Sequence, residues 1–154
     1  MIMSILKLEK EPAQLRIEAM NSYVKFLETM NDKTVAVSAR HFDKAVRYQG
    51  PFKDVSGREE IVGVFAERCC HAGGCKFKVH QILWSEDEQT AFLRWDMVTQ
   101  RGKEAKSTSG MSEVMLTLNG QVASHIDYFD PVPYMLHDMP IVGRMLRKMQ
   151  RTTT

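Results

Sequence analysis

The dipeptide Asn119-Gly120 lies between two runs of strand-forming residues and is the feature that most constrains the fold. Asn-Gly tolerates the positive φ angles of a type I′ turn, so it is the strongest short-range signal for a β-hairpin. It predicts a strand that begins at Gln121 and ends near Asp130. Alternation along this strand places four residues on one face: Ala123, His125, Asp127 and Phe129. A His and an Asp on one face need either water or a built polar site.

Three more strand patterns precede this one. Phe77 and Val79 alternate with polar residues, and further strands are expected over 90–100 and 105–118. Polar turns separate them, and Gly110 inside the third run indicates a bulge or a sharp bend. The sequence therefore predicts a four-strand antiparallel meander in the second half of the chain.

The first half reads as helices with one short strand. Pro12 suits a first helical position, and apolar residues then recur at helical spacing: Met20, Tyr23, Val24, Leu27 and Met30. A second short helix is expected over Thr34–Arg40 and an extended segment over Asp43–Tyr48. A capping box at Ser56 and Glu59 predicts a third helix over 57–71. The fold class is α+β, with helices on one face of a sheet.

The composition suits one compact domain. The chain has 154 residues, of which 44% are hydrophobic and 26% charged. Net charge is +2, but four cations and one anion follow Pro131, so the remainder is slightly acidic. This balance excludes a polyanion binder, and no nucleic-acid motif is present. We expect an N-terminal extension over 1–12, a domain over 13–130 and a tail over 131–154.

The N-terminal apolar run is too short for a signal sequence, and no run reaches the roughly 18 apolar residues of a membrane span. Three cysteines, an odd number, fit a reducing compartment, so we expect a cytoplasmic protein. Cys69, Cys70 and Cys75 do not predict a metal site. Adjacent helical residues point about 100° apart, and no second ligand pair follows at zinc-finger spacing. We expect Cys69 or Cys70 to pack inward.

The tail carries a basic, Met-rich amphipathic pattern. One helical face holds Met139, Val142, Leu146 and Met149, with cations elsewhere. Such a helix can lie on an anionic membrane surface. We favour the alternative, in which it packs over its own domain or a partner as a lid, because Met-rich faces suit adaptable apolar contacts.

Ionisable residues on the 90–100 strand suggest chemistry. Arg94 and Asp96 share one face with Phe92 and Val98. If that face also carries His125 and Asp127, two carboxylates meet around a guanidinium, which can grip both. Such a pair can divide into base and acid, and a tyrosine could hold a water. Taken singly, each charged residue is more often solvated.

The chain resembles the nuclear transport factor 2-like superfamily, which includes SnoaL-like polyketide cyclases, ketosteroid isomerases and limonene-epoxide hydrolases. The resemblance covers about residues 13–130. It rests on four motifs: Tyr48-Gln49-Gly50-Pro51-Phe52, Gly57-Arg58-Glu59, Arg94-Trp95-Asp96, and Gly120-Gln121-Val122 leading into Asp127-Tyr128-Phe129-Asp130. It implies a cone-shaped α+β fold, a cystatin-like roll, in which a curved sheet wraps around the N-terminal helices.

Within the superfamily the site pattern is most similar to that of the epoxide hydrolases. Arg94, Asp96 and Asp127 match their Arg-x-Asp and second Asp, and Tyr48 matches their water-positioning tyrosine. Gly50 stands where those enzymes carry an asparagine. The ketosteroid isomerase pattern fits less well.

The resemblance implies cofactor-free acid–base chemistry of the hydrolase, isomerase or cyclase type on an apolar, oxygenated small molecule. Four residues are expected to line the pocket: His125, Phe92, Phe65 and Phe129. It also implies a homodimer through the outer face of the sheet, with Trp95 and Met97 as candidates. The alternative is a non-catalytic ligand-binding or protein-interaction domain, since one fold hosts many functions.

Overall fold

A computed structural model describes residues 12–71, 75–101 and 103–132. Most of the predicted N-terminal extension and of the tail, including its Met-rich helix, lies outside these ranges. The helical elements are α1 (Pro12–Glu28), α2 (Asp32–Ala36), the short 3-10 helix η1 (Ser38–His41) and α3 (Arg58–His71). The strands are β1 (Phe42–Gln49), β2 (Asp54–Ser56), β3 (Cys75–Trp84), β4 (Thr90–Arg101), β5 (Glu104–Leu116) and β6 (Val122–Phe129).

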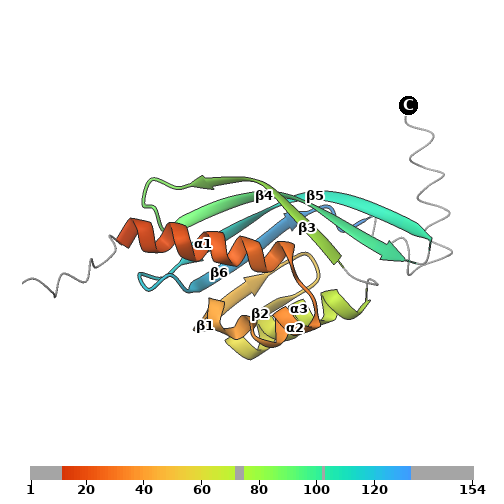
Figure 1. The fold of residues 1–154 in the computed structure, drawn as a ribbon, viewed down its shortest axis with the longest axis horizontal. Helices are drawn as coiled ribbons and strands as arrows, with labels where there is room; N and C mark the ends of the chain where they lie inside the picture. Colours follow the sequence, from red (N-terminus) through yellow and green to blue (C-terminus); the bar gives the residue numbers. More distant parts are fainter. Residues whose placement is uncertain (1–11, 72–74, 102, 133–154) are drawn as a thin grey trace, which may run out of the picture.

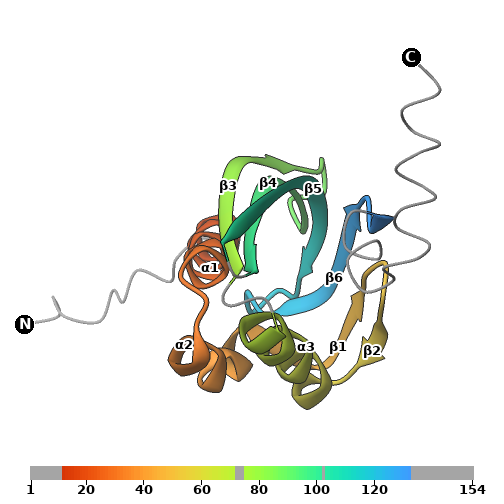
Figure 2. The ribbon, with the colours of Figure 1, turned by 90° about the vertical axis from the view of Figure 1, so that its right-hand side faces the viewer.

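All six strands form one sheet in the order β2-β1-β6-β5-β4-β3. Neighbours are antiparallel except β1 and β6, which pair in parallel. The sheet is curved and does not close. Figures 1 and 2 show it bending from β3 round to β1, with α1 beside β3 and α3 beside β1. The predicted α+β cone and its four-strand meander are confirmed.

The core fills the concave side of this sheet. On β4 the inward residues are Ala91, Leu93, Trp95 and Met97, all buried. They pack with helix residues, foremost Met20, Tyr23, Ile61 and Phe65. Burial of large apolar side chains is the main stabilising contribution to such a fold. The apolar face of β4 therefore turns inward, and its charged face turns outward.

The predicted hairpin between β5 and β6 is confirmed, but the predicted turn type, I′, is wrong. Gly120 N–H donates to the Thr117 carbonyl at 2.9 Å, and Gly120 has φ +78°. In the described ranges Glu88 is the single non-glycine residue with positive φ, so Asn119 does not adopt the conformation of a type I′ turn. The loop is a turn through Leu118 and Asn119, closed by a left-handed glycine.

Gly110 does not create a bulge. It pairs directly with Trp95 on β4 and with Phe129 on β6, and the register shift between β5 and β6 falls instead between Met115 and Leu116. A Cβ at Gly110 would lie 2.5 Å from the Trp95 ring. The glycine therefore makes room for the largest core side chain.

The start of α3 also differs from the prediction. Ser56 belongs to the short strand β2, which the sequence pattern did not indicate, and α3 begins at Arg58. Gly57 between them has φ +102°, which suits glycine. The helix thus begins one residue later than predicted, and the residue that precedes it is Gly57 and not Ser56, so the predicted capping box at Ser56 and Glu59 is wrong. Likewise the helix expected over Thr34–Arg40 is split into α2 and η1.

Candidate functional site

A carboxylate with four hydrogen-bond donors lies at the centre of the concave side. The Asp127 side chain on β6 is only 1% exposed. Its Oδ1 accepts from Ser112 Oγ at 2.6 Å and from His125 Nε2 at 2.7 Å. Its Oδ2 accepts from Tyr48 Oη at 2.8 Å and from Arg68 Nη2 at 2.7 Å. We call these five residues the Asp127 network.

Strand register brings the network together. Ser112 on β5 is the direct partner of Asp127, and Tyr48 on β1 is the parallel partner of His125. Directly paired residues point to the same face of a sheet, so all four side chains reach the concave side. Arg68 comes from α3, which packs against β1. Four segments that are distant in sequence therefore supply one site.

Two buried aromatic residues support the network from behind. Trp95 Nε1–H donates to Ser112 Oγ at 2.8 Å. Tyr23 Oη lies 2.7 Å from His125 Nδ1. Both rings are 1% exposed, so these hydrogen bonds are shielded from water. Polar groups at this depth need such partners.

The charges in the network stabilise each other. Burial alone would raise the pKa of Asp127, but His125, Arg68 and the hydrogen bond from Ser112 outweigh it and hold that pKa well below its usual range. Burial alone would lower the pKa of Arg68, but Asp127 raises it. Burial also raises the pKa of Tyr48, against the opposing effect of Arg68. The resting state is an ionised Asp127, a charged Arg68 and a neutral phenol.

Arg68 is the member of the network that reaches the surface. Its side chain is 20% exposed and lies over the rings of Tyr48 and Phe65 at 5.4 Å and of Phe77 at 6.0 Å. It donates to both Tyr48 Oη and Asp127 Oδ2 through Nη2. Within the described ranges both hydrogen bonds of the Arg68 guanidinium use Nη2, and none uses Nε or Nη1.

The structure shows why position 50 is a glycine. A Cβ at this position would lie 2.4 Å from Tyr48 Oη. The tyrosine hydroxyl therefore occupies the space that a side chain at position 50 would need. The departure from the asparagine of the epoxide hydrolases is coupled to the position of Tyr48 on Asp127.

Arg94 and Asp96 do not join Asp127, and the expected convergence of these three residues is wrong. Ser112 pairs with Leu93 on one side and with Asp127 on the other, so Leu93 and Asp127 share the inner face. Arg94 and Asp96 therefore point outward. Asp96 Oδ2 lies 2.8 Å from His80 Nε2, and its Oδ1 accepts from Ser109 at 2.6 Å. Hydrogen bonds from Ser109 and His80 lower the pKa of Asp96 on this exposed face.

The other predicted residues divide between the two faces. Phe92 pairs with Glu113 on the outer face, so it does not line the interior. Phe65 is fully buried, 6.1 Å from the His125 ring, and Phe129 lies 5.9 Å from Trp95. Trp95 and Met97 are buried within the chain and cannot form an outer dimer surface.

Sequence reasoning missed Arg68, Ser112 and Tyr23 as members of the site. Arg68 had a usable signal, because it follows Ile61 and Phe65 by seven and three residues and shares their helix face. Ser112 gave no comparable signal, since a serine in a strand is unremarkable until its pairing partner is known.

Within the described ranges, no group of three or more His, Cys, Asp or Glu residues could hold a metal ion. Cys75 is buried at the start of β3, and burial raises the pKa of its thiol to about 12. It is therefore a neutral core thiol at ordinary pH. Cys69 packs partly against the core, as expected, whereas the side chain of Cys70 lies outside the described part.

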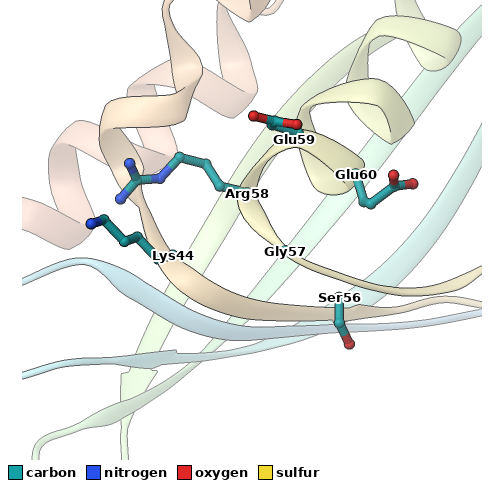
Figure 3. A pocket seen from close by; sticks show the side chains of 6 residues that line it. All are labelled: Lys44, Ser56, Gly57, Arg58, Glu59 and Glu60. Atoms are coloured by element: carbon teal, nitrogen blue, oxygen red, sulfur yellow. The ribbon is translucent and has the colours of Figure 1, made fainter.

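A surface pocket of about 450 Å³ lies at the other end of α3. Its lining shares no residue with the Asp127 network: Lys44, Ser56, Gly57, Arg58, Glu59 and Glu60. Figure 3 shows that it carries charges of both signs. Arg58 Nε donates to the Phe42 carbonyl at 2.9 Å, so this cation has a structural partner. The pocket is a mixed-charge hollow on the surface, separate from the Asp127 network.

Solved structures with the same fold are numerous, and three illustrate their range. An NTF2-like protein of unknown function from Cytophaga hutchinsonii is 18% identical with a TM-score of 0.61, over 84% of this chain and 99% of that one. An LEH-like epoxide hydrolase from M. tuberculosis is 15% identical with a TM-score of 0.60, over 75% and 83%. The epoxide hydrolase/cyclase-like enzyme SalBIII, which has a role in pyran ring formation in polyether salinomycin, is 15% identical with a TM-score of 0.63, over 76% of this chain and 92% of that one. These likenesses establish the fold.

No curated protein sequence matches the chain. No helix in the described ranges is long and apolar enough to cross a bilayer. The model of the SnoaL-like domain matches residues 23–125, which hold Tyr23, Tyr48, Arg68, Ser112 and His125. This match spans about two-thirds of the sequence, and the chain therefore belongs to the SnoaL-like domain family.

Proposed function

We propose that this SnoaL-like protein binds an apolar small molecule through an oxygen acceptor held by Arg68, and that it carries out cofactor-free acid–base chemistry of the isomerase or cyclase type. The observation that carries the proposal is the pairing of Arg68 Nη2 with Asp127 Oδ2 at 2.7 Å in a guanidinium that still reaches solvent. Aromatic side chains surround the guanidinium, so an apolar ligand would find both a polar anchor and an apolar wall.

In this mechanism Arg68 is the electrophilic residue. A carbonyl or developing enolate oxygen accepts from the N–H groups of Nε or Nη1, and the fixed positive charge stabilises negative charge as it forms. Asp127 is the proposed base. When Arg68 donates to a ligand oxygen, its interaction with Asp127 weakens. The ionised form of Asp127 is then less stabilised, and the pKa of Asp127 rises. Substrate binding thereby makes Asp127 more basic.

Hydrolysis by two carboxylates has less support. In the described ranges the network holds a single carboxylate, Asp127, while Asp96 lies on the outer face with His80 and Ser109. A division into one acid and one base needs two carboxyl groups whose environments push their pKa values apart. Proton abstraction and return at a carbonyl compound needs only one base with an electrophile.

A non-catalytic ligand-binding role is the second candidate, and one observation favours it. Four donors saturate the Asp127 carboxylate, and its pKa is held low. A carboxylate in this state is a weak base until a ligand disturbs it. In this case Arg68 would still recognise the ligand oxygen, but Asp127 would only hold Arg68 and Tyr48 in place.

Turnover by matched variants separates the two candidates. A panel of apolar ketones, enones, epoxides and polyketide-like compounds is tested for binding by calorimetry and for conversion by mass spectrometry. Asp127→Asn is compared with Asp96→Asn, the same substitution on the outer face. The catalytic proposal expects conversion that Asp127→Asn abolishes and Asp96→Asn retains. If compounds of the panel bind but none of them is converted, the non-catalytic role is favoured. Equal activity of a folded Asp127→Asn protein contradicts a base at Asp127.

A further inference from the structure

Two chains of hydrogen bonds lead to Asp127 Oδ1, one through Ser112 and one through His125, and in each chain every group donates toward the carboxylate. An indole N–H can donate but not accept, so Trp95 Nε1 donates to Ser112 Oγ across 2.8 Å. The Ser112 hydroxyl then directs its own proton to Asp127 Oδ1 at 2.6 Å, because an ionised carboxylate can only accept. The chain Trp95 to Ser112 to Asp127 therefore has a fixed polarity.

The second arm has the same polarity. His125 Nε2 lies 2.7 Å from Asp127 Oδ1 and must carry a proton to bond to it. Whenever the imidazole is neutral, its single proton lies on Nε2, so Nδ1 is the acceptor and receives the hydroxyl proton of Tyr23 across 2.7 Å. The phenol stays protonated, since burial and the nearby Asp127 charge raise the pKa of Tyr23. Asp127 thus selects the Nε2–H tautomer of His125, and Tyr23 holds the ring from the other side by donating to Nδ1.

The two oxygens of Asp127 differ in their access to a ligand. The partners of Oδ1, Ser112 and His125, are each about 1% exposed, as are Trp95 and Tyr23 behind them. The partners of Oδ2 are Tyr48 and the partly exposed Arg68. An incoming molecule can therefore replace Arg68 as a hydrogen-bond partner of Oδ2. The partners of Oδ1 are too deeply buried to be replaced.

We infer that Tyr23 and Trp95 are positioning residues that act through His125 and Ser112: they fix Oδ1 and leave Oδ2 as the one reactive oxygen of Asp127. The statement about reactivity rests on the proposed function. The direction of the hydrogen bonds does not, and it can be measured on the ligand-free protein.

Nitrogen-15 NMR of the histidine ring and of the tryptophan indole tests the inference at pH 8. The expected result is a His125 ring with its proton on Nε2 and an acceptor Nδ1. Replacement Tyr23→Phe should shift the Nδ1 resonance to that of a nitrogen without a hydrogen bond. A proton on Nδ1, or an Nδ1 resonance that Tyr23→Phe leaves unchanged, overturns the arm through Tyr23 and His125.

Exchange of the Trp95 indole proton with solvent tests the arm through Trp95 and Ser112. We expect slow exchange in the wild type and faster exchange in Ser112→Ala, which removes the acceptor, with recovery in Ser112→Thr, which restores a hydroxyl. Unchanged exchange in a folded Ser112→Ala protein overturns this arm. Spectra as expected together with no ligand binding at Arg68 would leave the hydrogen-bond polarity standing and refute the proposed function alone.

If a ligand from the panel binds, its addition should perturb the Arg68 and Tyr48 resonances and preserve the His125 Nε2 proton. Loss of that proton on ligand binding would contradict Oδ2 as the single reactive oxygen.

Discussion

Tyr48 Oη donates to Asp127 Oδ2 at 2.8 Å, although the two residues lie 79 positions apart in the sequence. The parallel pairing of β1 with β6 makes this contact, because it places Tyr48 opposite His125, two residues before Asp127. The same pairing closes the meander onto the helical half of the chain. The strand pairing that joins β1 to the sheet therefore also brings Tyr48 to Asp127.

The stability of the fold should depend on the charge of Asp127. Asp127→Asn leaves the partly exposed Arg68 guanidinium without its counter-charge, so the free energy of unfolding should fall, but by less than the roughly 3–5 kcal/mol that a fully buried pair loses with one partner. Urea unfolding at pH 7 measures it. The control is Asp96→Asn, whose carboxylate is solvent-exposed and should change stability little. Equal losses in the two variants would contradict a buried ion pair at Arg68.

Acid should remove the contribution of Asp127. Its folded-state pKa lies below its unfolded value of about 3.9, so its stabilisation is fully present above that value and declines as the pH falls below it. The difference in unfolding free energy between wild type and Asp127→Asn should thus shrink between about pH 4 and pH 3. Unfolding by urea at a series of pH values tests this. A difference that grows on acidification would reverse the assigned direction of the pKa shift.

Gly50→Ala should displace the Tyr48 hydroxyl. The added Cβ would lie 2.4 Å from Tyr48 Oη, and overpacking of this kind costs about 1–3 kcal/mol. The matched control is Gly63→Ala in α3, where nothing lies within 4 Å of the new Cβ and helix propensity predicts a gain of up to about 1 kcal/mol.

A second substitution identifies the cause of the Gly50 effect. In a Tyr48→Phe background the hydroxyl is absent, so Gly50→Ala should cost less than in the wild type. Thermal unfolding of the four proteins in this cycle gives the coupling between the two positions. Full additivity would mean that Gly50 does not depend on the Tyr48 hydroxyl.

We propose that the outer sheet face, and not Trp95 or Met97, pairs two copies of the chain. Met111 and Tyr128 are direct neighbours on this face and are 41% and 55% exposed. Light scattering should give a dimer mass for the wild type and a monomer for Tyr128→Glu. Val37→Glu is the control, since Val37 is equally exposed at the α2–η1 junction, away from the sheet. A monomeric wild type would refute the proposal.

Periodicity and turn signals predicted much of the fold, and alternation predicted two of the five residues of the Asp127 network. Alternation correctly placed His125 and Asp127 on one face of their strand, and helical spacing located α1 and α3. Alternation does not, however, say which face of β4 meets that face of β6. The apolar set Leu93, Trp95 and Met97 decides it, because burying these side chains outweighs any pairing of Arg94 and Asp96 with Asp127.

Contacts between distant segments were beyond sequence reasoning. The pairing of Ser112 with Asp127 depends on the register of β5 against β6, which a shift near Met115 adjusts by one residue. The approach of Arg68 depends on how α3 packs against β1. Both follow from tertiary packing: helical spacing can place Arg68 on the core face of α3, but it does not say which strand residue Arg68 meets.

The central claim is that Arg68 recognises the oxygen of an apolar ligand, and calorimetry with matched variants tests it most directly. Arg68→Met and Arg94→Met remove the same charge from the inner and the outer side of the sheet. For a ligand found in the panel, we predict that Arg68→Met weakens binding by about 10- to 100-fold, the value of a charge-assisted hydrogen bond, and that Arg94→Met leaves it unchanged. Undiminished binding by a folded Arg68→Met protein would contradict the account.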